Sequence, residues 1–239
     1  MKLTDKLLIQ LDHWVNIWTA NLAVLFSVGA RLNRASIIEK LGLALRARSF
    51  NQWKVLQHCN KIGRNCDIHP TAYIECSTIG DNVKVGAGTV IRESVIGDDV
   101  FIGDSVSVEV SILGKGCHIM TGEVIAYSVL YPGAFSDSRI LEMVLCGRDS
   151  FVGASILTDF RLDGKYITVM KGDTLIDTGN TFIGVCVGHN VYVGAGCIVA
   201  PGREIPNDTR ISPDETRVVT KFTDKDMPGH RRIIFHSNK

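Results

Sequence analysis

The sequence predicts a mainly β fold in which short strands wind into a stack of coils. A six-residue repeat runs through most of residues 63–207, and an aliphatic residue opens each unit. Glycine often follows it, and the fifth position is small or β-branched. A single short strand cannot bury its own apolar face, whereas stacked coils share one continuous core.

The repeat assigns each of its positions a direction. We expect the aliphatic and the small residue to point inward, which places Cys117 and Cys197 in the core as small apolar residues. We expect glycine at tight corners that need a positive φ. Units that carry the pattern include IGDNVK at 79, VGAGTV at 85, IGDDVF at 96, IGDSVS at 102, LGKGCH at 113, VGHNVY at 187 and VGAGCI at 193.

Glu123 does not fit the pattern of the repeat. A strict register would point it inward, where an unpaired carboxylate is unfavourable. We therefore expect the register to slip at this residue, and the alternative is that Glu123 lines a cleft.

Residues 1–62 are predicted to be a helical segment. Leu7, Leu11, Trp14, Trp18 and Leu25 recur at three- and four-residue steps and fall on one face. Asn21 lies on the same seam, where a polar residue can fix the register of a helical oligomer. A second helix is expected to start near Ser36, because Ser36–Glu39 has the spacing of a capping box.

The stretch Trp14–Ala30 contains no charged residue, but it is short and polar compared with the roughly 20 apolar residues of a membrane span. Three interpretations remain open: a span, a helix in the membrane interface, and a helix packed on its own protein or on a sister subunit.

Composition limits the class of protein. The net charge of +1 gives no field for nucleic acid. Seven scattered cysteines without a C-x-x-C pair argue against a disulfide framework and a structural zinc site, so a reducing cytoplasm is expected. No signal-peptide cleavage pattern follows the first apolar run. Residues 208–239 form a basic C-terminal tail.

The six-residue repeat resembles that of the hexapeptide-repeat family, whose members fold as left-handed parallel β-helices. The resemblance implies acyl transfer from acetyl-CoA or a related donor, and a homotrimer with sites between subunits. Within that family, the chain is most similar to the C-terminal acetyltransferase-type domain of sugar-1-phosphate nucleotidylyltransferases. Two segments carry this similarity. ASILTDFRLD (154–163) resembles the motif G-T-I-T-x-N-L-R-F-D of that domain, and KGDTLIDTG (171–179) resembles its motif K-G-x-x-I-x-T-G.

The repeat stops within Val152–Asp173, where this resemblance implies an arm at about residues 161–180 that reaches a neighbouring subunit and walls the site. The glycine-rich start of the nucleotidyl-transfer domain has no counterpart in residues 1–62, so sugar-nucleotide synthesis is not expected. The predicted organisation is a helical segment at 1–62, a β-helix with the arm at 63–207, and the tail at 208–239.

The resemblance also implies a catalytic His one coil before the arm, but no His occurs between His118 and His189. Asp137 and Ser138 stand in that region and are the candidate catalytic residues. An exposed carboxylate, with a pKa near about 3.9, is a weak base at neutral pH.

The substrate-binding positions implied by the resemblance are altered as well. The sugar-binding Asn aligns with Asp159, and a basic run after the arm is replaced by Asn180, Thr181 and Phe182. The candidate binding residues are thus Asp159, Arg161, Asn180 and Thr181. The spacing of His69, His118 and His189 does not match a metal site that uses adjacent coils, so no metal is expected.

Two functions remain open from the sequence. The first is a divergent acyltransferase-like protein that binds acyl-CoA or a sugar nucleotide between subunits. The second is a catalytically inactive trimeric scaffold that binds a protein or membrane partner through its helices and arm. Peripheral membrane contact through residues 1–34 stays an alternative within the cytoplasmic assignment.

Overall fold

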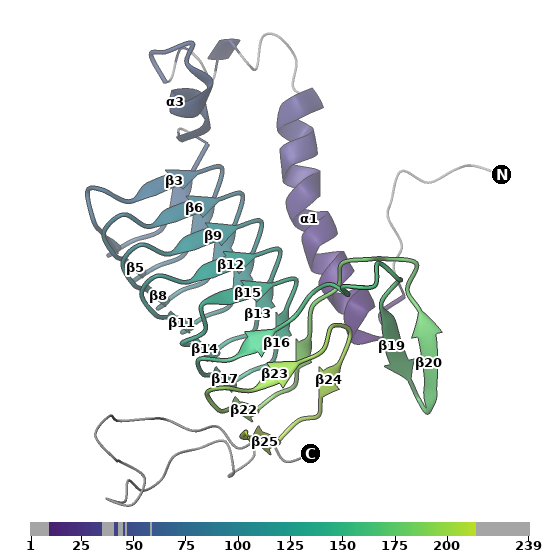
Figure 1. The fold of residues 1–239 in the computed structure, drawn as a ribbon. Helices are drawn as coiled ribbons and strands as arrows, with labels where there is room; N and C mark the ends of the chain where they lie inside the picture. Colours follow the sequence, from purple (N-terminus) through teal and green to yellow (C-terminus); the bar gives the residue numbers. More distant parts are fainter. Residues whose placement is uncertain (1–9, 35–40, 43–44, 46, 58, 214–239) are drawn as a thin grey trace, which may run out of the picture.

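The computed structural model describes residues 10–34, 41–42, 45, 47–57 and 59–213. Helix α1 (Trp14–Arg34) and the short helix α3 (Gln52–Gln57) precede a long stack of β-coils. Figure 1 shows the coils following one another along one axis, with α3 at the N-terminal end of the stack and α1 running alongside it, its own N-terminal end near β19. The chain is a left-handed parallel β-helix, as predicted.

Three flat sheets form the sides of the stack. We call them sheets A, B and C. Sheet A has the order β1 (Lys61–Ile62), β4 (Thr78–Ile79), β7 (Val95–Ile96), β10 (Ile112–Leu113), β13 (Val129–Leu130), β16 (Leu145–Cys146), β21 (Cys186–Val187) and β24 (Glu204–Ile205).

Sheet B has the order β2 (Asp67–Ile68), β5 (Lys84–Val85), β8 (Phe101–Ile102), β11 (His118–Ile119), β14 (Phe135–Ser136), β17 (Phe151–Val152), β22 (Tyr192–Val193) and β25 (Arg210–Ile211). Sheet C has the order β3 (Tyr73–Glu75), β6 (Val90–Arg92), β9 (Ser107–Glu109), β12 (Val124–Ala126) and β15 (Ile140–Glu142). The pair β18 (Ile156–Leu157) and β23 (Ile198–Val199) continues sheet C, because β15 contacts β18.

The core runs through the whole stack. Most strands of the three sheets place one aliphatic residue inward, where it packs in the shared core. Cys117 and Cys197 are also buried in this core, which confirms their predicted direction. The largest fully buried side chains of the stack include Ile91, Ile96, Ile102, Leu113, Ile119, Ile125, Leu130 and Leu141.

The expected positive φ is found at corner glycines such as Gly88 and Gly116, but not at the glycine that follows the aliphatic residue. Gly80 follows the aliphatic residue of its unit, but it is not among the residues with positive φ. A Cβ built on it would lie 2.7 Å from the backbone N of Asp98 in the next coil. The small residue is therefore needed because the coils approach closely. The positive φ falls instead on corner residues such as Asn82 and Asp99, and on Gly116.

The expected register slip at Glu123 is wrong. Val124 pairs with Ser107 before it and Ile140 after it in continuous parallel register. Glu123 points inward and is 2% exposed. Space exists for it because Ser136 occupies an inward position that holds Ile119 in the previous coil. The link from β14 to β15 is also one residue shorter than the link from β11 to β12.

Helix α1 packs on the outer face of sheet A. Trp14, Trp18, Leu22 and Leu25 form a buried cluster with residues of sheet A, including Val129 and Leu145. The indole N–H of Trp18 donates to the Tyr127 carbonyl over 2.7 Å. Of the three interpretations of this stretch, packing on the chain itself is the one seen. No helix in the described part of the chain is long and apolar enough to span a membrane.

Other expectations for this segment had mixed outcomes. Leu11 is 61% exposed, so it does not belong to the buried seam. The Asn21 side chain donates to the Ile17 carbonyl of its own helix over 2.8 Å. Leu7 and the helix start expected near Ser36 lie outside the described residues.

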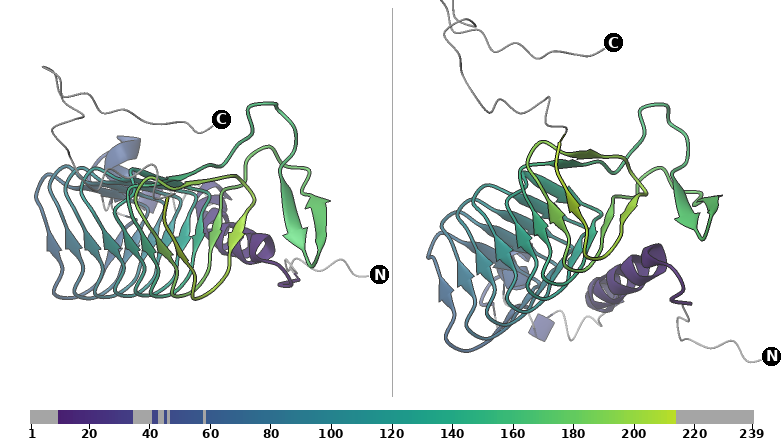
Figure 2. Two further views of the ribbon diagram at one scale, coloured as in Figure 1. Left: turned by 60° about the horizontal axis from the view of Figure 1, so that its bottom comes forward. Right: turned by 90° about the horizontal axis from the view of Figure 1, so that it is seen from below.

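The arm is a two-stranded hairpin of β19 (Thr168–Lys171) and β20 (Thr174–Asp177). It lies beside the N-terminal end of α1 (Figures 1 and 2). His13 Nε2 lies 2.8 Å from the Met170 carbonyl, and Lys171 pairs with Asp12 over 2.7 Å. Within one chain, the arm therefore holds α1 against the coil stack, while the residues of β20 remain exposed.

Candidate functional site

Asp137 lies at the edge between sheets B and C. Its backbone N–H donates to the Val152 carbonyl over 2.8 Å, which fixes its place on the coil, and its side chain is exposed. Arg139 follows on the same edge with an exposed side chain. A carboxylate can accept a proton from an attacking amine or hydroxyl, and a guanidinium can bind a phosphate through paired hydrogen bonds. This edge therefore offers two of the groups that acyl transfer from a coenzyme requires.

Ser138 lies between these two residues but faces the interior. It is 1% exposed, and its hydroxyl lies 3.2 Å from the Ser155 carbonyl and 3.3 Å from the Ile140 carbonyl. Its backbone N–H donates to Ser136 Oγ over 3.3 Å. The Ser138 hydroxyl is thus hydrogen-bonded within the coil stack, whereas the Asp137 side chain faces solvent.

An exposed column of apolar side chains starts beside this edge. We call Val124, Ile140, Ile156 and Ile198 the apolar column. They lie at the first position of β12, β15, β18 and β23, and their exposed fractions rise along the stack through 40%, 53%, 58% and 70%. Val124 pairs with Ile140, and Ile156 pairs with Ile198. A flat apolar strip of this kind marks an interaction or ligand surface.

The apolar column was not predicted from the sequence. The signal was nevertheless present, since the outward position of sheet C holds Val, Ile, Ile and Ile in four coils. This signal is hard to recognise in the sequence, because the inward residues of the same strands are equally apolar. Only the pairing of the coils shows that these four side chains share one outer face.

Asp159 lies at the base of the arm, half-buried. Burial raises its pKa above the ordinary value. The pKa of Glu142 is raised too, first by burial and then by the negative charge of Asp159. Two carboxylates with raised pKa values would repel a phosphate when ionised, which agrees with the altered sugar-binding position noted in the sequence.

Arg161 does not present a free cation. Its Nε donates to Asp163 Oδ1 over 2.9 Å, and the pair lowers the pKa of the Asp163 carboxyl. Asn180 Oδ1 accepts the N–H of Phe182 over 3.1 Å, and Thr181 is the half-buried residue between them. Phe160 bridges Phe182 at the point where the arm leaves the stack. These candidates shape the base of the arm and come from a different corner of the coil than Asp137.

The side chains of His118 and His189 make packing and hydrogen-bond contacts on the coils. His118 points outward, as predicted, and stacks between Phe101 and Phe135 with ring centroids 5.1 and 5.7 Å apart. His189 Nδ1 accepts the N–H of Arg148 over 2.8 Å. Asp81 accepts the N–H of Arg64 in the same way at another coil. Among the described residues, no group of three His, Cys, Asp or Glu side chains could hold a metal ion.

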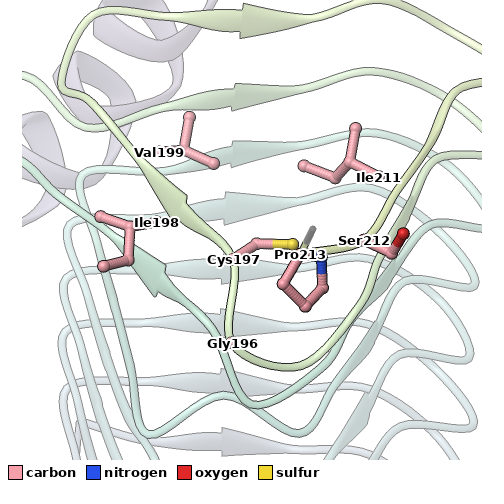
Figure 3. A pocket seen from close by; sticks show the side chains of 7 residues that line it. All are labelled: Gly196, Cys197, Ile198, Val199, Ile211, Ser212 and Pro213. Carbon is pink, nitrogen blue, oxygen red and sulfur yellow. The ribbon is translucent and has the colours of Figure 1, made fainter. Parts of the chain in front are cut away.

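A shallow pocket of about 270 Å³ lies at the C-terminal end of the described stack. Figure 3 shows Cys197, Val199, Ile211 and Pro213 around it. Ile198 belongs both to this pocket and to the apolar column. The pocket therefore extends the apolar surface along the stack, but it is lined by coils beyond the one that carries Asp137.

Comparison with known proteins supports the resemblance inferred from the sequence. Residues 52–134 match the family model of the GMPPB C-terminal domain. The match covers well under half of the chain and ends before the arm. No curated protein sequence matches the chain significantly.

Solved structures with some likeness include three acyl-transfer proteins. The acetyltransferase domain of PglB from Neisseria gonorrhoeae FA1090, in complex with acetyl coenzyme A, is 15% identical over 61% of this chain and 50% of that chain, with a TM-score of 0.20. PerB from Caulobacter crescentus, in complex with CoA and GDP-perosamine, is 17% identical over 72% of this chain and 59% of that chain, with a TM-score of 0.20.

The UDP-N-acetylglucosamine acyltransferase from Campylobacter jejuni is 11% identical over 62% of this chain and 64% of that chain, with a TM-score of 0.23. The matches span less than two thirds of the length of each of these three chains. Identities and TM-scores this low indicate nothing about the activity of this chain.

Proposed function

We propose that this protein is a divergent acyltransferase-like hexapeptide-repeat protein that binds acyl-CoA between the subunits of a homotrimer. One observation carries the proposal: the exposed Asp137 and Arg139 stand at the edge of the apolar column, on a sheet face that α1 leaves uncovered. The family resemblance, together with the match of residues 52–134, adds the expectation of an acyl donor.

The apolar column explains why the site would lie between subunits. The side chains of this strip have exposed fractions from 40% to 70%, so covering the strip with a second surface lowers the free energy of the assembly. Closed cyclic symmetry lets each copy cover the column of its neighbour without leaving an open edge. The apolar pantetheine chain of the coenzyme would then lie between two columns, and Arg139 would meet a coenzyme phosphate.

The proposed reaction is acyl transfer to an amine or hydroxyl. The acceptor attacks the thioester carbonyl carbon, the carbon–sulfur bond breaks, and the acyl group joins the acceptor. Asp137 takes the acceptor's proton, which then passes to the departing CoA thiolate. Asp159, Arg161, Asn180 and Thr181 at the arm base would bind the hydroxyl groups of an uncharged sugar acceptor supplied to the neighbouring copy's Asp137.

Acetyl-CoA binding and turnover test the proposal together. We expect acetyl-CoA and CoA to raise the unfolding temperature of the native protein, because a ligand that binds only the folded state stabilises it. Arg139→Ala should weaken CoA binding by about tenfold, since it removes one charge-assisted phosphate contact. Asp137→Asn should keep CoA binding but lose acetyl transfer to an amine or hydroxyl acceptor.

Lys84→Ala is the matched control, because Lys84 lies exposed on sheet B, away from the apolar column. Its CoA affinity should equal that of the unmodified protein. Failure of millimolar CoA to bind the unmodified protein would overturn the donor assignment.

A second candidate function is a cytoplasmic scaffold that binds a protein partner through α1 and the arm. Two observations favour it. The arm contacts the start of α1 through His13 and Met170, and Leu175 and Ile176 of β20 stay exposed. In this case Leu175→Asp should abolish capture of the partner without changing CoA binding. If the full-length Leu175→Asp protein sedimented with its partner, or with anionic vesicles, as the unmodified protein does, this function would be rejected.

A further inference from the structure

The N-terminal end of the coil stack is closed by α3 and the turn that follows it. Figure 1 shows α3 lying over β3 at this end. The Asn60 side chain ties the turn to the first two coils: Oδ1 accepts the N–H of Ser77 over 3.0 Å, and Nδ2 donates to the Ile74 carbonyl over 2.6 Å. The first coil of a solenoid has no preceding coil to cover its core, so it needs such a cap.

Two cysteines lie side by side where this cap meets the first coil. The backbone N–H groups of Cys59 and Cys76 both donate to the carbonyl oxygen of Leu56, over 3.1 and 3.2 Å. The Cys59 thiol lies 3.6 Å from the Val55 carbonyl oxygen, and the Cys76 thiol lies 3.8 Å from that of Leu56. Both sulfurs therefore sit against consecutive carbonyl groups at the end of α3.

This placement brings the two cysteines close together, as a disulfide requires, and the Cys59 side chain interacts with the Cys76 thiol. Bridged cysteines have Cα atoms about 4.4–6.8 Å apart. Two residues whose amide nitrogens share one acceptor oxygen lie within two hydrogen-bond lengths of each other. Both thiols are free and half-buried, so a small disulfide reagent can reach them.

The remaining cysteines differ from this pair. Cys117, Cys146, Cys186 and Cys197 are buried in the stack. Cys66 is half-buried as well, but its thiol donates to the Gly80 carbonyl over 3.1 Å on the first coil. Burial, with the neighbouring Cys59 as a further cause, raises the pKa of Cys76 to about 12. Because only a thiolate attacks a disulfide, exchange at Cys76 should be slow at neutral pH.

We propose that Cys59 and Cys76 form a reversible disulfide that locks the cap onto the first coil when the thiol pool becomes oxidising. The co-reactant is a low-molecular-weight disulfide such as oxidised glutathione. One protein thiolate attacks it and releases one reduced thiol. The second protein thiolate then attacks the mixed disulfide and releases the other, so that both cysteines are oxidised and two small thiols are formed with their protons.

The proposal does not depend on acyl transfer. A single bridge that forms on oxidation also differs from the permanent disulfide framework that the cysteine spacing argues against. The bond would join position 59 to position 76, so the turn after α3 could no longer separate from the coil. It would thus act on the end of the solenoid, far along the chain from the edge that carries Asp137.

Peptide mapping of the full-length protein tests this assignment. The protein is incubated with oxidised glutathione, its remaining thiols are alkylated, and it is digested without reduction by trypsin and an aspartate-directed protease. Cleavage before Asp67 separates Cys66 from Cys76. We expect a peptide of residues 55–61 linked to one of residues 67–80, which disappears on reduction.

Matched variants make the result specific. Cys59→Ser should abolish the linked peptide, whereas Cys66→Ser, which replaces the third half-buried cysteine, should leave its yield unchanged. Glutathione adducts on Cys59 and Cys76 without the linked peptide would overturn the proposal. Unmodified thiols at both positions under conditions that oxidise a control dithiol would do the same.

Discussion

The hydroxyl of Ser136 donates to Glu123 Oε2 over 2.6 Å inside the coil stack. The other carboxyl oxygen of Glu123 accepts the N–H of Met120 over 2.9 Å. Burial raises the pKa of Glu123 to about 7, and the negative charge of Asp137 acts in the same direction. The core therefore holds a carboxyl group that keeps its proton over part of the pH range in which an exposed glutamate would lose it.

Folding stability should fall as the pH rises from about 4.3 to about 7, because the unfolded chain releases the Glu123 proton first. The total loss is on the order of 3 kcal/mol and should level off above that window. Urea unfolding at pH 5 and pH 8 measures it. Glu123→Gln carries no ionisable proton at this position and should show a smaller difference between the two pH values.

Glu93→Gln is the control for this measurement, because Glu93 is an exposed corner residue. Its pH dependence should match that of the unmodified protein. Equal pH dependence of Glu123→Gln and the unmodified protein would contradict the buried-carboxyl interpretation.

A ladder of buried serines joins successive coils at the corner between sheets C and A. Ser94 Oγ accepts the N–H of Ser111 over 3.1 Å, and Ser111 Oγ accepts the N–H of Ser128 over 3.0 Å. Ser111→Ala should destabilise the protein by about 1–3 kcal/mol, because it leaves the buried N–H of Ser128 without its acceptor. Thermal unfolding followed by circular dichroism checks this.

Ser107→Ala serves as the comparison, since Ser107 is a half-buried outward residue of sheet C. It should change stability by much less than Ser111→Ala. Equal effects of the two substitutions would argue against the ladder as a stabilising element.

The attachment of α1 depends more on Trp18 than on the ion pair at the helix start. Trp18→Phe keeps a buried ring but removes the 2.7 Å hydrogen bond to the Tyr127 carbonyl, so we expect a loss of about 0.5–1.5 kcal/mol or more. Lys171→Ala breaks a partly exposed ion pair with Asp12 and should destabilise the protein less than Trp18→Phe does, because water screens such a pair. Denaturant unfolding of both variants ranks the two contacts, and a larger effect of Lys171→Ala would contradict this order.

The proposed homotrimer depends on the apolar column. Ile156→Asp places a charge at the centre of the column, so the protein should elute with the mass of a single chain rather than of a trimer. Stability of the single chain should change by about 0.5 kcal/mol at most, because the side chain is 58% exposed. Size-exclusion chromatography with light scattering measures the mass.

Lys84→Asp also places a negative side chain on an outer face, that of sheet B, and it should leave the assembly intact. A single-chain mass for the unmodified protein would remove the basis for a site between subunits. CoA binding to that single chain would then point to a donor site on one chain alone.

Much of the fold could be predicted from local pattern. The six-residue repeat placed Cys117 and Cys197 in the core, and it gave His118 an outward direction, because a coil imposes the same direction on each equivalent position. The seam of Trp14, Trp18 and Leu25 similarly identified the buried face of α1. Such inferences succeed where one residue's environment follows from its place in a short period.

The tertiary structure decided what depends on the relation between coils. Glu123 was predicted to leave the register, yet it stays inward because Ser136 in the next coil vacates the space and supplies a hydrogen bond. Ser138 and Asp137 are neighbours in sequence, but a shortened link turns one into the core and the other to solvent. Likewise, the repeat does not show that the residues of the apolar column lie on one face, or that Cys59 lies next to Cys76. Sequence period sets the direction of a side chain within its own coil, whereas stacking of the coils determines which side chains it meets.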